Sequence, residues 1–76
     1  MTHATDRTLA EAIAHADYWA KTYGEDRAVF VATGTDRFGR DGVVYVRPPD
    51  DAEMIGMRDA GKVTTAYVVR AKAVQS

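Results

Sequence analysis

The stretch Thr33–Gly42, TGTDRFGRDG, comes closest to a motif with known chemistry. Gly34 and Gly39 have the glycine spacing of a phosphate-binding P-loop, and Arg40 stands where that motif has lysine. The motif also needs Ser or Thr after the lysine, to bind Mg²⁺, and then a helix whose N-terminus faces the phosphates. Here Asp41 follows, and the next residues form a strand-like run. The sequence therefore argues against a nucleotide-binding loop.

A β-hairpin connection explains the same stretch better. Asp41 and Gly42 supply hairpin-turn chemistry, and the two earlier glycines permit a positive φ. The loop is longer than a tight turn requires, so it presents Phe38 between Arg37 and Arg40. Phe38 either folds back onto the domain or serves as an exposed anchor with arginine neighbours of the kind enriched at interfaces. Arg37, Phe38 and Arg40 are therefore candidate partner-binding residues.

Catalytic and metal-binding chemistry finds little support elsewhere in the chain. Glu11 and His15 share a helix face, but two ligands do not make a metal site, and an ion pair or hydrogen bond explains them better. The only serine is Ser76, and the chain has no cysteine, so the common nucleophiles are missing. We expect no enzyme activity, no metal and no cofactor.

A run of acidic residues follows Pro48-Pro49 and includes Asp50, Asp51 and Glu53. These residues are either plain solubility charge or an acidic patch that binds a basic surface, including one that normally receives nucleic acid. The run also carries a weak helix-capping signal. We take the three acids as candidate partner-binding residues, and we expect charge reversal at Asp50 and Asp51 to leave the fold intact because they lie in a loop.

The first structural element is a helix over residues 8–23. Thr8 and Glu11 form a capping-box pattern, apolar residues recur every three or four positions, and Gly24 suits a left-handed C-terminal cap. Tyr18 falls on the polar side, either as a lone exposed aromatic or in a contact patch with His15 and Thr22.

Three β-branched and aromatic runs predict strands over residues 27–33, 43–47 and 62–73, with a short helical turn between the last two. The 76 residues therefore form a single α+β domain, one N-terminal helix packed on a three-stranded antiparallel sheet. The residues expected to supply core contacts are Ile13, Ala16, Trp19, Val29, Val31, Tyr45, Tyr67 and Val69.

The strands predict a sheet with two apolar faces. Val29 and Val31 alternate with Ala28 and Phe30, so neither face is polar, whereas one long helix can cover only one of them. The second face needs cover from the Met54–Met57 segment, from another copy of the chain or from a partner. Homodimerisation is therefore one of the expected associations.

Composition favours a soluble, cytoplasmic protein. The chain has no cysteine, its N-terminus lacks the apolar segment of a signal peptide, and no apolar run is long enough to span a bilayer. Its 10 basic and 11 acidic residues lack the basic excess of a protein that coats DNA. Nucleic-acid binding through the Arg37–Arg40 tip remains the alternative to protein binding.

The whole chain resembles small phage-encoded inhibitors of the anti-CRISPR kind. The segments that carry this resemblance are the capped helix from Thr8 to Gly24 and the strand-like runs after it, without cysteine or a catalytic set. The resemblance implies a stoichiometric, non-enzymatic inhibitor that binds a CRISPR effector component through an acidic or mixed surface. No residue of this sequence receives a specific role from it.

Overall fold

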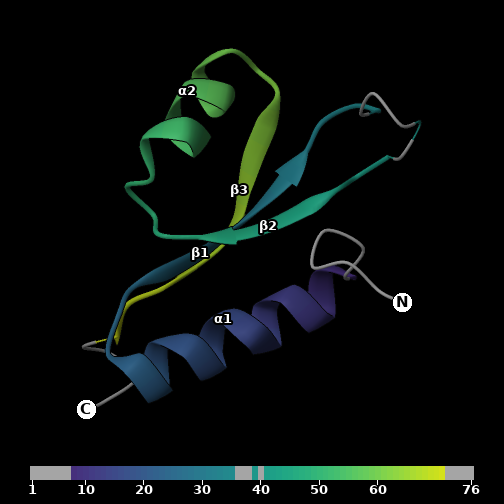
Figure 1. The fold of residues 1–76 in the computed structure, drawn as a ribbon. Coiled ribbons are helices and arrows are strands. Elements are labelled where there is room, and N and C mark those ends of the chain that lie inside the picture. The colour runs from purple at the N-terminus through teal and green to yellow at the C-terminus, as the bar shows by residue number, and fades with distance from the viewer. Residues whose placement is uncertain (1–7, 36–38, 40, 72–76) are drawn as a thin grey trace.

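The computed structural model describes residues 8–35, 39 and 41–71. Five elements follow one another along the chain (Figure 1): α1 (Leu9–Tyr23), β1 (Arg27–Ala32), β2 (Val44–Arg47), α2 (Ala52–Asp59) and β3 (Val63–Val69). This order confirms the predicted α+β class, with the long helix first and a short helix before the last strand.

Helix α1 begins and ends where its sequence predicts. Thr8 Oγ1 accepts a hydrogen bond from Glu11 N at 3.2 Å, and Glu11 Oε1 accepts one from Thr8 N at 3.1 Å, which completes the capping box. At the other end, Gly24 adopts φ 67° and its N–H donates to the Ala20 carbonyl oxygen at 3.0 Å. A left-handed glycine therefore stops the helix, as expected.

The sheet is antiparallel, with β1 in the centre and the order β2-β1-β3. The register between β1 and β3 shifts at one point, because Val29 pairs with Tyr67 whereas Phe30 pairs with Thr65. Ala66 is thus an extra residue in β3, and a bulge of this kind reverses which face the following side chains point to. As a result β3 supplies Val63 to one face of the sheet and Tyr67 to the other.

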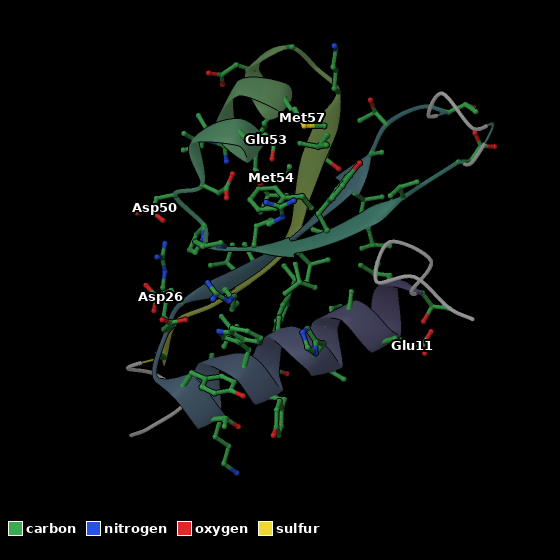
Figure 2. All side chains as sticks on the ribbon, in the orientation of Figure 1. Glu11, Asp26, Asp50, Glu53, Met54 and Met57 are labelled. Atoms are coloured by element: carbon green, nitrogen blue, oxygen red, sulfur yellow. The ribbon has the colours of Figure 1, made fainter. Side chains whose placement is uncertain are left out.

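Each face of the sheet is covered by one helix, as Figure 1 shows. The buried residues on the α1 side are Ala12, Ala16, Ala20, Val29, Val44, Val69 and Ala71. Those on the α2 side are Ala28, Phe30, Met54 and Val63, and in Figure 2 Met54 and Met57 point from α2 toward the sheet. The two apolar faces predicted from the strands are confirmed, and the Met54–Met57 segment provides the second cover.

The predicted core is right at its centre and wrong at Trp19. Ala16, Val29 and Val69 are buried, and Ile13, Val31, Tyr45 and Tyr67 are half-buried but pack against the clusters. Trp19 is half-buried and belongs to neither cluster. The three buried residues of α1 are all alanines, so this helix covers the sheet with small side chains and the larger indole lies at its flank.

Strand β3 is shorter than the predicted 62–73, because it ends at Val69 opposite the first residue of β1, Arg27. The Ala71 N–H donates instead to Asp26 Oδ1 at 2.8 Å. The last two positions of the predicted strand, 72 and 73, lie outside the described residues. Neither described helix has the length and apolar character needed to cross a bilayer.

Candidate protein-interaction surface

Aromatic side chains follow one flank of α1. Positions 15, 18, 19 and 23 are separated by three and four residues, so they lie along one strip of the helix surface. We call His15, Tyr18, Trp19 and Tyr23 the α1 aromatic strip. It lies beside the buried alanine line, on the flank opposite Asp17.

Three of these rings stack along the helix. The His15 and Trp19 centroids lie 5.8 Å apart with an interplanar angle of 59°, and those of Trp19 and Tyr23 lie 4.7 Å apart at 49°. Tilted ring pairs at such separations are the arrangements that aromatic quadrupoles favour. His15, Trp19 and Tyr23 therefore form a continuous array of contacting rings.

Residues just beyond the helix hold the Trp19 indole in place. The Arg27 guanidinium carbon lies 4.8 Å from the indole centroid, within the range of a cation–π contact. Glu25 Oε1 accepts a hydrogen bond from Trp19 Nε1 at 3.0 Å and forms a 2.8 Å ion pair with Arg27 Nη2. The indole is thus fixed at one face and at its polar edge.

The two tyrosines of the strip are exposed, Tyr18 to 60% and Tyr23 to 58%. Tyr, Trp and Arg are the residue types most enriched at energetic centres of protein interfaces. Because neighbouring side chains already hold Trp19, a partner that docks here loses little side-chain entropy in ordering it. The strip therefore has the composition and the rigidity of a protein-binding surface.

The opposite flank of α1 is tied to the sheet. The Tyr67 hydroxyl donates to Asp17 Oδ1 at 2.6 Å, and this hydrogen bond raises the Tyr67 pKa above its ordinary value. The bond joins α1 to β3 across the sequence and fixes the rotation of the helix about its axis. That rotation keeps the aromatic strip turned away from the core.

Two of the three candidate acids have structural partners. Asp51 is the N-cap of α2, and its Oδ1 accepts a hydrogen bond from Met54 N at 3.0 Å. Arg47 Nη1 lies 3.8 Å from Asp51 Oδ2 and 3.6 Å from Glu53 Oε1. Asp51 therefore does not lie in a loop, as expected, but caps α2, and a lysine there would remove the cap. The expectation that charge reversal leaves the fold intact stays a prediction.

Asp50, the third candidate acid, is exposed and lines an open groove of about 500 Å³ at one end of the sheet. Asp26 lines the same groove, and Figure 2 shows both acids at this end of the molecule. Asp26 accepts hydrogen bonds from Ala71 N at 2.8 Å and from Arg70 Nη1 at 3.2 Å. Both bonds lower the pKa of Asp26, and the bond from the Ala71 backbone has the larger effect. In this groove Asp26 therefore binds the residues that follow β3, and Asp50 lies on the rim.

The other predicted partner-binding residues, Arg37, Phe38 and Arg40, lie outside the described residues. The base of their loop is a hairpin, as predicted, since Thr35 and Asp41 form an isolated antiparallel bridge and their side chains are hydrogen-bonded. Gly39 and Gly42 have positive φ values of 79° and 61°, whereas Gly34 does not need one.

Within the described residues, no group of three or more His, Asp or Glu side chains is placed to hold a metal ion. The aromatic strip differs from the site predicted from sequence, because Trp19 and Tyr23 look like core residues in the helical periodicity. The i, i+4 spacing of three rings, followed by Arg27 just past the helix cap, was the available signal.

Comparison with protein-family models finds no match for this chain, and comparisons with curated proteins and with solved structures find none either. The resemblance to anti-CRISPR inhibitors therefore stays a prediction.

Proposed function

We propose that this protein is a non-enzymatic protein-binding module that acts by occupying a surface of another protein, with the α1 aromatic strip as its contact face. The observation that carries the proposal is the fixed Trp19 indole, held by Arg27 and Glu25 beside two tyrosines that are more than half exposed. Rigid aromatic residues at a surface supply large contact area at low entropic cost.

We propose that this binding inhibits the partner stoichiometrically. A module that buries part of a partner's surface blocks whatever else uses that surface, without any chemistry of its own. A CRISPR effector component is the target class implied by the resemblance, and the cytoplasm is the compartment that fits it. The exposed Asp50, on the groove rim, would meet basic residues at the edge of the contact.

Affinity capture with matched variants tests the proposal. The tagged protein, the double variant Tyr18→Ala plus Tyr23→Ala, and the control Lys21→Gln are each exposed to lysate of the native host, and bound proteins are quantified. Both tyrosines are largely exposed, so their removal should leave the fold intact, and Lys21 is an exposed residue of the same helix. We expect one or a few proteins to be retained by the wild type and the control and lost from the double variant. Equal capture by all three forms would contradict the proposal.

Titration with labelled duplex and single-stranded DNA at two salt concentrations addresses nucleic-acid binding through the Arg37–Arg40 tip. Phosphate contacts release counterions, so such binding would be steeply salt-dependent. We expect weak binding to both forms of DNA, because the chain carries 10 basic against 11 acidic residues. Submicromolar affinity that falls steeply with salt would replace our proposal with that function.

A further inference from the structure

Strand β3 forms an open edge of the sheet. It pairs with β1 on one side, and no described strand pairs with its other side. Thr64, Thr65 and Ala66 are exposed, and Val68 is exposed to 41%. An exposed edge strand presents backbone donors and acceptors to which another extended chain can pair.

The register shows which backbone groups of β3 face outward. Thr33 N donates to the Lys62 carbonyl oxygen at 3.0 Å, which makes this a hydrogen-bonded position of the ladder. Residues alternate along an antiparallel ladder, so Thr64, two positions on, also faces β1. Val63 and Thr65 therefore direct their N–H and C=O groups away from the sheet.

The two edges of the sheet differ in their protection against pairing. Strand β2 has four residues and runs directly into Pro48-Pro49, which cannot donate to a ladder. Strand β3 has seven residues, VTTAYVV, with neither a charged residue nor a proline. Its one irregularity is the bulge at Ala66, which leaves the Val63–Thr65 half regular. The first half of β3 is thus the unprotected part of the edge.

Charge decides which kind of chain fits this edge. Lys62 precedes the strand and Arg70 follows it, so a second copy paired antiparallel along the whole of β3, centred on Ala66, would bring Lys62 of one chain against Arg70 of the other. Such like-charge contacts oppose full-length pairing with a second copy. Lys62 has no ion pair among the described residues, and Arg58 donates only a 3.3 Å hydrogen bond to Thr65 Oγ1. These two cations outnumber Asp59, the one acid between the last turn of α2 and the start of β3.

We propose that the outer edge of β3 binds an extended segment of a partner protein by strand addition, with an acidic side chain of that segment beside Lys62 and Arg58. Main-chain hydrogen bonds to Val63 and Thr65 provide the attachment, and the acidic side chain selects the segment. This surface is separate from the α1 aromatic strip. Strand β3 contacts α1 through the Tyr67–Asp17 hydrogen bond, and Asp17 lies on the flank of α1 opposite the strip.

A peptide titration tests the proposal. The ¹⁵N-labelled protein is titrated with the capped peptide Glu-Val-Thr-Val-Thr-Val-Glu, with the same peptide bearing Lys at both ends, and with one bearing Pro at its centre. We expect the Glu peptide to shift the Val63 and Thr65 amide signals and to slow Thr65 amide exchange. The Lys and Pro peptides should bind at least tenfold more weakly. No shift at these amides up to about 2 mM Glu peptide would overturn the proposal.

Two variants separate the backbone contact from the charge contact. Thr65→Pro removes an outward N–H that β1 does not use, and it should abolish peptide binding. Lys62→Glu should leave the fold unchanged and weaken binding of the Glu peptide relative to the Lys peptide by at least tenfold. Equal affinity of Lys62→Glu and wild type for the Glu peptide would overturn the charge selection. A concentration-dependent dimer that Thr65→Pro abolishes would overturn the proposal in favour of a second copy.

The double variant Tyr18→Ala plus Tyr23→Ala should bind the Glu peptide like the wild type. Failure of the aromatic strip as a binding surface would then leave the edge-strand result unchanged. Loss of peptide binding in that variant would overturn the assignment of the peptide to β3.

Discussion

Replacing Met54 by alanine tests whether α2 holds the second face of the sheet. Met54 is 1% exposed and packs with Ala28, Phe30 and Val63. Truncating a buried methionine costs about 2–5 kcal/mol of unfolding free energy, from lost burial plus the cavity that remains. The cluster borders on half-buried side chains that can relax into part of the cavity, so we expect about 2–3 kcal/mol.

Such a loss is large for a chain of this length. At roughly 0.05–0.15 kcal/mol per residue, the whole domain has about 4–11 kcal/mol of stability. The expected loss lowers the melting temperature by about 10–20 °C. Since α2 is the only described element over Phe30 and its neighbours, its release would also expose a new apolar surface to dyes that bind such surfaces.

The assay is urea unfolding of wild type and Met54→Ala, followed by far-ultraviolet circular dichroism and by Trp19 fluorescence. Trp19 lies on the α1 side, so coincident transitions would show that both cores unfold together. The control is Glu53→Gln, also on α2, whose side chain is 65% exposed and which should change stability by no more than about 0.5 kcal/mol. A loss below about 1 kcal/mol for Met54→Ala, close to the control, would refute the claim that α2 covers this face.

Three further predictions concern the other contacts. Trp19→Ala should lower the unfolding free energy by about 1–2 kcal/mol in a urea melt, because the indole lies outside both cores. A loss of about 3–5 kcal/mol, as for a buried tryptophan, would place it in the core. Asp51→Ala should cost about 1 kcal/mol through loss of the α2 cap, while Asp50→Ala should be neutral, and equal effects in thermal melts would argue against the cap. Asp26 has a lowered pKa, so its bond to Ala71 should stabilise the fold above the ordinary pKa of 3.8 and lose that contribution as the pH falls through the folded value. Asp26→Asn should therefore flatten the stability decline below about pH 4 in melts across pH, and an unchanged decline would contradict this.

The elements with strong local signals could be predicted from the sequence. The capping box at Thr8 and the glycine at position 24 bound α1 because both act through neighbouring backbone groups. The apolar residues on both faces of β1 predicted that a second cover is needed, and Met54 supplies it. These features depend on spacing along the chain, which the sequence contains directly.

The features that were missed depend on contacts between distant residues. Trp19 has helical core spacing, yet the residues of α1 that contact the sheet are three small alanines, and the indole packs against Arg27 and Glu25 beside them. Asp26 binds the Ala71 amide, 45 positions away, which ends β3 earlier than its β-branched run predicts. The sequence places Asp51 in a loop because the capping signal there is weak beside Pro48-Pro49, whereas Asp51 caps α2.

Calorimetric titration of the captured partner, purified and titrated with wild type, Tyr23→Ala and Lys21→Gln, tests protein binding through the α1 aromatic strip most directly. Our account predicts a saturable one-to-one isotherm for wild type and Lys21→Gln. Tyr23 is 58% exposed and its ring contacts Trp19. The Tyr23→Ala substitution should therefore weaken binding about tenfold or more. Equal affinity of Tyr23→Ala and wild type for the partner would contradict the assignment of this surface.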